Sequence, residues 1–458
     1  MRKRLINGQV FDGEQFLPKE IVIENGIIQS IEDPHHAERD HPVLLDVKGA
    51  MVLPGFIDPH VHFNDPGRAD WEGFPTGSSG AAAGGITTVF DMPLNSHPSA
   101  NTSTVLNKKK QALQGRSYTN YGLWAGMTAD VVDHEKELEA MIDCGVVGFK
   151  GFMSDSGIDD FKRLNRSALF QAMKFCAQSN SLLALHAEWE ETLSRSSYLQ
   201  KQSPRSFLDS RPVKAEMDAV KLAMEAAAKY GTKVHIVHVS HPDVVDIIQT
   251  AKKSGVDATL ETCPHYLLFN EEDFIREGPL LKCAPPVRDS ESVEGLWDRI
   301  GAGQIDFISS DHSPCPPSMK LAGVKDIRDS WGGIQSVQFG TTAFLSEAKK
   351  RGLSLSNVLP LLTSNISKRF PPLQTQGEIK VGMEAHFAIY EPAQVTLIEK
   401  QDILFRHNYS PYVGKQIEGR ISHTIVHGEV VFDRPFGMIG PFVGRDICAE
   451  HSRSFDHL

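Results

Sequence analysis

Cysteine is scarce in this sequence, and long apolar runs are absent from it. Its six cysteines are spread over 458 residues and never form a Cys-x-x-Cys pair, so we expect no disulfide framework and a reducing, cytoplasmic location. No stretch of about 18 apolar residues occurs, so we expect no membrane-spanning helix. The N-terminus has basic residues but no apolar segment and no small-residue cleavage site, so we expect no secretion signal.

An excess of positive charge is also lacking. The 47 Lys and Arg residues against 58 Asp and Glu residues give a net charge of −11, and the two signs are interleaved along the chain. Nucleic acids and anionic membranes are bound by basic patches, so we expect neither partner and expect a small molecule instead. Fixed-period repeats and low-complexity segments are absent too, which argues against solenoids. The basic run Lys108–Lys110 is expected to be a solvated helix face.

The sequence does contain the alternation of strands and helices that is typical of a parallel barrel. Short apolar strands such as 182–186 alternate with helical stretches such as Ala215–Tyr230, which predicts βαβ units. At this length the pattern favours a (β/α)8 TIM barrel over an open sheet. Both chain ends instead carry β-branched runs separated by turns, so we expect them to pair into one small β-sandwich domain. The expected domains are 1–53 with 383–458 for the β-sandwich, and 54–382 for the barrel.

The strongest local signal is a pair of histidines, His60 and His62, at the end of an apolar strand. Side chains at positions i and i+2 lie on the same face of a strand, so both imidazoles can bind one metal ion. A strand-end histidine can equally serve as a hydrogen-bond partner of a loop. The pair by itself leaves both roles open.

Three further strand ends carry residues of the types that bind metals, namely His186, His238 and Asp311. In a barrel the C-terminal strand ends meet on one face, so we expect these residues to converge with the histidine pair. A buried acid among histidines is costly without a cation, so Asp311 is interpreted as a ligand that also moves protons. His235 is the alternative to His238, but its offset of three residues is expected to place it on the opposite strand face.

Lys150 lies within what should be a buried strand, between the apolar residues 146–149 and 151–152. Desolvation lowers the pKa of a lysine and leaves a nucleophilic neutral amine. Such an amine can take up carbon dioxide as a carbamate whose two oxygens bridge two metal ions. An ion-paired core lysine or a Schiff-base lysine fits the residue alone equally well, and the neighbouring His and Asp candidates favour the bridging role.

With these residues in order, the sequence resembles the cyclic amidohydrolase branch of the metal-dependent amidohydrolases, the group of dihydroorotase, dihydropyrimidinase/hydantoinase and allantoinase. The segments 261–267 and 310–315 are long, specific matches to this branch. The resemblance implies two divalent metal ions, with zinc expected and cobalt, manganese or iron as alternatives, and carbon dioxide to carboxylate a lysine. The implied site has one metal on His60, His62 and Asp311, the other on His186 and His238, a bridge from N6-carboxylated Lys150, and Asp311 as the catalytic base.

The residues that follow the histidine pair bear on which ring is opened. Dihydroorotase-like chains place an arginine there to hold the substrate carboxylate, whereas this chain has Asn64, which cannot bind a carboxylate bidentately. Arg68 is the candidate substitute for that arginine. Hydantoinase-like chains lack the run 65–68. The segments that resemble the allantoinase form are 91–96, 282–288 and 330–334.

The resemblance therefore implies hydrolysis of the hydantoin ring amide of allantoin to allantoate, by a hydroxide that the two metals activate. Dihydroorotase or hydantoinase/dihydropyrimidinase activity is the alternative, and a non-catalytic barrel scaffold is a remote one. Relatives form homotetramers, which implies the same assembly here. The expected substrate contacts are Asn64, Asn95, Ala284 and His265.

A few other residues near the strand ends keep two interpretations. His241 and His312, like His265, fit a contact with the substrate or with the metal ligands as well as a purely structural role. Cys263 and Cys283 are interpreted as buried, inert thiols rather than as metal ligands. His386 stands where relatives commonly have aspartate, and we expect it to affect only the local turn.

Overall fold

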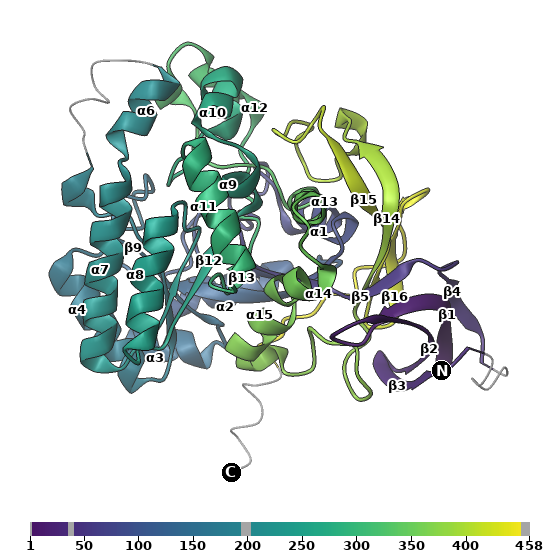
Figure 1. Cartoon of the computed structure of the whole chain (residues 1–458). Helices are drawn as coiled ribbons and strands as arrows, with labels where there is room; N and C mark the ends of the chain where they lie inside the picture. The colour runs from purple at the N-terminus through teal and green to yellow at the C-terminus, as the bar shows by residue number, and fades with distance from the viewer. Residues whose placement is uncertain (1, 35–40, 194–202, 450–458) are drawn as a thin grey trace.

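The computed structural model describes residues 2–34, 41–193 and 203–449. Eight parallel strands form a nearly closed barrel surrounded by helices, and a second, mixed sheet of nine strands is built from both chain ends (Figure 1). This arrangement confirms the predicted fold class, a (β/α)8 barrel with a β domain formed by the two termini. The domain limits at 53/54 and 382/383 stay a prediction, and the segment 444–449 lies along barrel strand β8 rather than in the mixed sheet.

The barrel strands follow one another in chain order around the sheet, each parallel to the next. Parallel neighbours require a crossover between them, and each strand here is followed by one or more helices. The strands are β6 (Phe56–Val61), β7 (Ile86–Asp91), β8 (Asn120–Gly126), β9 (Gly148–Phe152), β10 (Leu182–His186), β11 (Lys233–Ile236), β12 (Ala258–Thr262) and β13 (Phe307–Ile308).

The helices alternate with these strands and cover the outside of the barrel (Figure 1). Most of them bury one apolar stripe against the strands and expose a polar one, as expected of helices in an α/β layer. The α-helices are α1 (Phe74–Ala83), α2 (Ser103–Leu113), α3 (Glu135–Asp143), α4 (Arg166–Gln178), α6 (Pro204–Ser210), α7 (Val213–Tyr230), α8 (Pro242–Lys253), α9 (Pro264–Leu268), α10 (Glu271–Glu277), α11 (Ser290–Gly301), α12 (Pro317–Leu321), α13 (Gly340–Lys350), α14 (Leu355–Val358) and α15 (Ser364–Arg369).

The mixed sheet joins the two ends of the chain. Its order is β17-β16-β15-β14-β5-β1-β2-β3, with β4 paired to β1, and the antiparallel pair β5·β14 is the seam between the N-terminal and C-terminal strands. A separate hydrophobic cluster forms the core of this domain. The strands are β1 (Arg2–Phe11), β2 (Phe16–Glu24), β3 (Ile27–Glu32), β4 (Val43–Asp46), β5 (Met51–Pro54), β14 (Phe387–Leu397), β15 (Gln416–Val426), β16 (Glu429–Asp433) and β17 (Gly437–Met438).

The junction of the two sheets positions the histidine pair. Strand β5 of the mixed sheet is separated from barrel strand β6 by Gly55 alone. A Cβ at Gly55 would lie 2.3 Å from Thr87 Oγ1, so only glycine permits this close approach of the chain to β7. The start of β6, the strand that carries His60 and leads to His62, is therefore anchored by the β domain.

The barrel closes where β6 meets the segment after β13. Val61 forms a parallel bridge with His312, and the Ser310 N–H donates to Asp58 Oδ1 at 3.1 Å. Inside the barrel, side chains from alternate strand positions such as Phe90 and Trp124 form a compact apolar cluster, as in other parallel barrels. Because the interior is filled, polar chemistry is confined to the C-terminal strand ends.

The expectation that Lys108–Lys110 forms a solvated helix face is wrong for its middle residue. Lys108 is exposed, but Lys109 is only 1% exposed and its Nζ lies 2.5 Å from Asp91 Oδ2. The other oxygen of Asp91 accepts the Phe63 N–H at 2.7 Å. This buried ion pair therefore fixes the chain directly after the histidine pair, a contact that a sequence pattern does not reveal.

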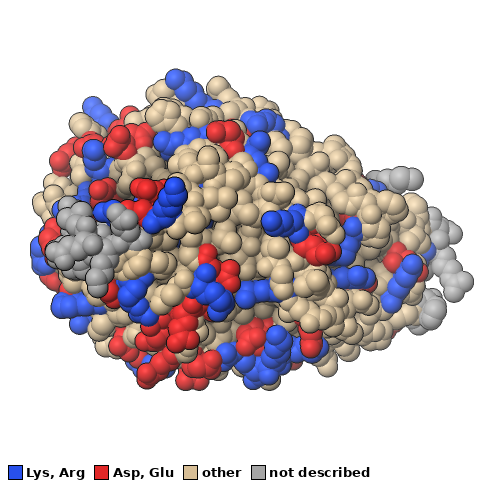
Figure 2. Space-filling model, turned by 90° about the horizontal axis from the view of Figure 1, so that it is seen from above, with Lys and Arg blue, Asp and Glu red and all other residues tan. Residues whose placement is uncertain are grey.

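The surface carries charges of both signs. Figure 2 shows lysine and arginine side chains interspersed with aspartate and glutamate on the face seen from above. Among the described helices, none is both long enough and apolar enough to cross a lipid bilayer.

Candidate metal centre and substrate pocket

A pocket of about 540 Å³ opens at the C-terminal ends of the barrel strands. Its position is the one where parallel barrels bind their substrates. All six residues expected from the sequence to be metal ligands line this one pocket: His60, His62, Lys150, His186, His238 and Asp311.

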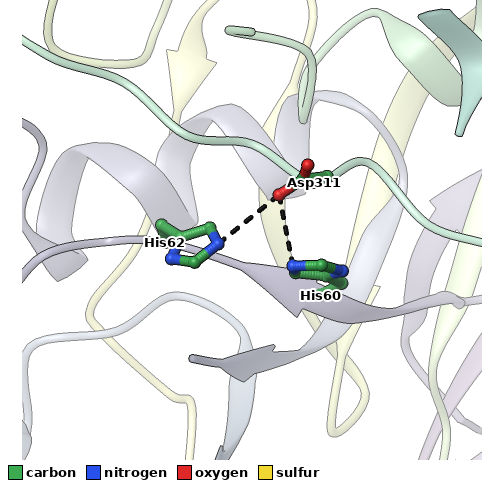
Figure 3. A group of neighbouring side chains, drawn as sticks. All are labelled: His60, His62 and Asp311. Atoms are coloured by element: carbon green, nitrogen blue, oxygen red, sulfur yellow. Dashed lines mark ion pairs between the residues drawn. The ribbon is translucent and has the colours of Figure 1, made fainter. Parts of the chain in front are cut away.

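His60, His62 and Asp311 form one group within the pocket. His60 projects from β6, His62 lies one residue after the end of that strand, and Asp311 approaches from the loop after β13 (Figure 3). The Nε2 atoms of His60 and His62 lie 3.2 and 3.4 Å from Asp311 Oδ1. Two nitrogens bound to one tetrahedral zinc are about 3.3 Å apart, so the spacing of these three ligand atoms fits a single divalent cation.

Both histidines of this group are oriented by a hydrogen bond from the other ring nitrogen. His60 Nδ1 donates to Glu261 Oε1 at 2.6 Å, and His62 Nδ1 donates to the main-chain oxygen of Leu94 at 2.7 Å. A proton on Nδ1 leaves the Nε2 lone pair free and directed at Asp311. The protein therefore presets the tautomer that a metal requires.

His186 and His238 form the second group. His186 Nδ1 lies 3.0 Å from His238 Nε2, again close to the spacing of two nitrogens on one metal. His186 Nε2 donates to Glu188 Oε2 at 2.8 Å. Arg211 donates to both oxygens of Glu188, at 3.0 Å through Nε and 2.6 Å through a terminal nitrogen. A buried carboxylate with an arginine behind it thus orients this histidine.

Lys150 lies among these side chains on β9. It is fully buried, and its Nζ has no hydrogen-bond partner among the described residues. Burial lowers the pKa of Lys150 to about 7, against the opposing effect of Glu261 and Asp311. Buried polar groups are almost always partnered, so a bare amine in this place indicates that a group absent from the protein chain belongs beside it.

The electrostatics of the pocket also suit a cation. Burial lowers the pKa of His60, His186 and His238, so their rings are neutral and can offer lone pairs. Burial alone would raise the pKa of Asp311, whereas positive charge on His60 and His62 holds it at about 2. With the rings neutral, a bound cation would supply that positive charge and keep Asp311 ionised. Neutral imidazoles with an ionised carboxylate are the forms in which these residues bind metals.

His238 is brought to the pocket by a turn rather than by strand alternation. Strand β11 ends at Ile236, and His238 has φ 42°, a left-handed conformation that is uncommon outside glycine. His235 also faces inward, with Nε2 3.1 Å from Glu261 Oε2. The prediction that His235 lies on the opposite face from His238 is therefore wrong. His235 does not line the pocket but supports the carboxylate that orients His60.

Of the four expected substrate contacts, the structure brings two to the pocket wall. Asn95 and Ala284 line the pocket, whereas Asn64 and His265 are absent from its lining. Asn64 is buried with Nδ2 donating to the Pro314 oxygen at 3.3 Å. His265 is fully buried, with neither ring nitrogen bonded among the described residues.

The remaining candidates have structural roles. His241 caps α8 by accepting the Asp243 N–H at 3.1 Å. The His312 ring accepts the Ser336 N–H at 3.1 Å, and its Nε2 lies 3.3 Å from Glu72. Burial raises the pKa of the Cys283 thiol to about 12 and that of Cys263 well above its usual value, so both stay protonated and are poor ligands.

A second cluster of ligand-type residues, Glu384, His386 and His427, lies outside the pocket. His386 Nδ1 accepts the His427 main-chain N–H at 3.2 Å, so the proton is on Nε2, which donates to Glu384 at 2.6 Å. Metal binding through that Nε2 would need an imidazolate, so we assign a structural role. His427 Nε2 also donates to Asn120 Oδ1 of β8 at 2.8 Å, so His386 belongs to a link between sheet and barrel, beyond the local turn expected for it.

The sequence reasoning missed the acids behind the histidines. Glu261 begins the segment 261–267, which resembles the cyclic amidohydrolase branch, and Glu188 lies two residues after His186. Both are fully buried. An acidic residue in an otherwise apolar strand end, near a candidate histidine ligand, would have pointed to them. A carboxylate buried there needs a hydrogen-bond donor such as an imidazole N–H.

Glu188→Gln is expected to weaken metal binding at the His186 and His238 group by about 10- to 100-fold. Glutamine keeps the shape of Glu188 but removes the charge that holds both His186 and Arg211. The measurement is the number of metal ions per chain after dialysis against a graded series of chelator concentrations. Glu191→Gln, an exposed neighbour, is the matched control. Wild-type metal retention by Glu188→Gln would show that Glu188 does not orient a ligand.

Comparison with known proteins places this site in a family. The model of the amidohydrolase family matches residues 51–431. An allantoinase of Rubrobacter xylanophilus is 38% identical over 92% of this chain and 92% of its own length. An allantoinase of Deinococcus radiodurans is 40% identical over 87% and 88%, and one of Arabidopsis thaliana is 37% identical over 90% and 84%.

Solved structures of cyclic amidohydrolases share the fold. An L-hydantoinase (dihydropyrimidinase) from Arthrobacter aurescens superposes with a TM-score of 0.91 at 27% identity, covering 96% of this chain and 98% of that one. A D-hydantoinase (dihydropyrimidinase) from Thermus sp. gives 0.89 at 25% identity, covering 97% and 98%. With the family model matched over most of the length and relatives this similar, the chain belongs to the amidohydrolase family.

Proposed function

We propose that this enzyme is an allantoinase, which hydrolyses a ring amide of the hydantoin ring of allantoin to give allantoate. The observation that carries the proposal is its higher identity to allantoinases, over nearly the whole chain, than to the hydantoinase structures. The second candidate is hydantoinase activity, which the close superposition on L-hydantoinase favours.

The state of Arg68 argues against a dihydroorotase. Its guanidinium donates to the main-chain oxygen of Asn95 at 3.0 Å and lies 4.9 Å from the centre of the Trp71 ring. Arg68 is not part of the pocket lining. A carboxylate substrate needs a guanidinium that can turn two N–H groups toward it, and this one is already engaged elsewhere.

Apart from Lys150, the lysine and arginine side chains in the described pocket wall, Arg211 and Lys282, are also engaged. Arg211 donates to both oxygens of Glu188, and the Lys282 ammonium donates to three main-chain oxygens. Cations that are already partnered are poorly placed to hold a substrate anion. The pocket therefore suits a neutral ring with polar substituents, which is the chemistry of allantoin.

For the site itself, we propose that His60, His62 and Asp311 hold one divalent metal, that His186 and His238 hold the other, and that carboxylated Lys150 bridges them. When bound, the two metals lower the pKa of a water molecule and polarise the carbonyl under attack. The buried, unpartnered amine of Lys150 and the preset histidine tautomers support this arrangement. Zinc is the expected metal, because imidazole and carboxylate ligands suit it.

Asp311 carries the proton in this proposal. Its Oδ1 faces the two histidines, and its low pKa keeps it ionised. The carboxylate takes the proton of the attacking water as the bond from that oxygen to the ring carbonyl carbon forms. It then delivers the proton to the ring nitrogen as the carbon–nitrogen bond breaks, because an amide anion is too basic to leave unprotonated.

Assembly, location and domain limits are also proposed rather than observed. We infer a homotetramer in the cytoplasm. We also infer that 1–53 and 383–458 belong to the β domain and 54–382 to the barrel, with the exception of 444–449, which lie along barrel strand β8. The basis is likeness to relatives for the assembly and the scarcity of cysteine for the location.

Turnover of racemic allantoin, measured beside hydantoin and dihydroorotate on one metal-reconstituted sample, tests the proposal. We expect allantoate from allantoin, with kcat/KM at least about tenfold above either other substrate, and about two metals per chain. The same sample after chelation should be inactive and should recover on adding zinc with bicarbonate. Faster turnover of hydantoin would favour the second candidate, and faster turnover of dihydroorotate would give Arg68 the role denied to it here.

A further inference from the structure

Two buried lysines beside the pocket have no role in the proposed chemistry. Lys320 is 1% exposed and Lys282 is 6% exposed. In the described part of the chain, neither ammonium lies within ion-pair distance of a carboxylate. Burying a charge without an opposite charge is costly unless hydrogen bonds replace its hydration, so the contacts of these two ammonium groups need an explanation.

The Lys320 ammonium donates only to main-chain oxygens. Its Nζ reaches Gly333 at 2.5 Å, Trp331 at 3.0 Å and Lys282 at 3.2 Å. Trp331 and Gly333 line the pocket. Lys320 itself, at the end of α12, does not line it, so this lysine holds the pocket wall from behind.

The Lys282 ammonium likewise donates only to main-chain oxygens, those of residues in the segment 327–330. It donates to the oxygens of Ser330 at 2.6 Å, Ile327 at 2.8 Å and Arg328 at 3.3 Å. The Lys282 main-chain oxygen accepts the Gly333 N–H at 2.8 Å, so the same residue contacts both ends of 330–333.

Three acceptors for each Nζ match the three donors of an ammonium group. A neutral amine has two N–H donors, so both triads are satisfied only by charged lysines. A chain segment with several inward-facing carbonyls would be unstable without donors. No neutral side chain carries three donor hydrogens on one atom, so a lysine ammonium suits each of these positions.

From these contacts we propose that Lys320 and Lys282 are positioning residues, which hold residues 330–333 as the wall against which the substrate binds. We call this segment the lysine-held wall. The inference rests on the proposed function for its substrate, a neutral cyclic amide with a polar substituent.

The lysine-held wall offers the substrate a packing surface. Trp331 stands edge-on to Trp71, with ring centres 4.9 Å apart, so its ring has little freedom to move. Its Nε1 is buried without a hydrogen-bond partner in the described chain. The side chain of Trp331 lines the pocket, so its ring is a packing surface for the cyclic amide. The two lysines thus act on the substrate through the placement of Trp331.

Lys320→Met tests the inference, because methionine is similar in length to lysine but leaves three carbonyls without donors. We expect kcat/KM to fall by about 100-fold, mostly through KM, since small displacements of a positioning group cost that much. Metal content should stay at the wild-type value. Lys325→Met is the control, because Lys325 is exposed in the same segment. Lys320→Arg keeps the charge in a planar donor group and should recover part of the loss.

Hydrogen–deuterium exchange of peptides covering 316–333 gives a readout that needs no substrate. We expect faster exchange in Lys320→Met and no change in Lys325→Met. The kinetics are run on whichever cyclic amide the wild-type enzyme hydrolyses fastest, so failure with allantoin alone would refute the proposed function and not this inference. Unchanged KM in Lys320→Met, or loss of metal with unchanged exchange, would overturn the inference.

Discussion

Lys150→Ala is expected to lower kcat/KM for the hydrolysis of allantoin by more than about 1,000-fold. Removal of the proposed bridge takes away ligand oxygens from both metals, and metal activation of water contributes several kcal/mol to such reactions. The metal content should fall below two ions per chain. Both quantities are measured on one preparation grown with zinc and bicarbonate.

Three further experiments distinguish a metal-bridging role of Lys150 from a packing role. A small carboxylic acid such as acetate, added to Lys150→Ala, should restore measurable turnover because it supplies the missing carboxylate oxygens. Lys108→Ala, at an exposed lysine, should match the wild type. Intact-mass measurement under native conditions should find one carbon dioxide on the wild-type chain and none on Lys150→Ala. Retention of two metals and of near-normal turnover by Lys150→Ala would rule out the bridging role.

Asp311→Asn should remove most of the activity as well, by about 1,000-fold or more. Asparagine preserves the shape but cannot accept and return a proton, and general acid–base catalysis contributes about 10²- to 10⁴-fold. The loss of a negative charge beside His60 and His62 also weakens the metal site. The measurement is kcat/KM for allantoin across the neutral pH range, with metal content determined at each stage of purification.

The pKa of Asp311 sets how this variant differs from the wild type. Because positive charge beside Asp311 holds its pKa at about 2, the carboxylate is ionised throughout the neutral pH range of the assay. The deficit of Asp311→Asn should therefore persist at all of these pH values and should not be recovered at high pH. Asp298→Asn, at an exposed position, is the control. Activity within about tenfold of the wild type would assign proton transfer to another group.

Several features of the site follow from local patterns. The two-residue spacing of His60 and His62 predicts a shared strand face, and the structure shows both Nε2 atoms directed at Asp311 Oδ1. The barrel was likewise predictable, because alternating strands and helices force parallel pairing in chain order. Such patterns depend on neighbouring residues only, so a sequence carries them in full.

The side chains that support the ligands were not predictable in the same way. Glu261 lies 201 positions from His60, which it contacts, and no spacing rule connects the two. Lys109 looked like one of three solvated lysines, yet it is buried on Asp91. His238 reaches the pocket through a left-handed turn that strand alternation does not anticipate.

By itself, the sequence determined the class of fold and the strand ends that carry chemistry, because periodicity and short spacings are properties of the local chain. The set of six expected metal ligands came from its resemblance to the cyclic amidohydrolases. Only the tertiary structure decided which acid orients which histidine, that Arg68 is turned onto Asn95, and that two lysines hold the pocket wall. These contacts join residues from different strands and loops. Their geometry is set when the barrel closes, since closure brings all the C-terminal strand ends to one face.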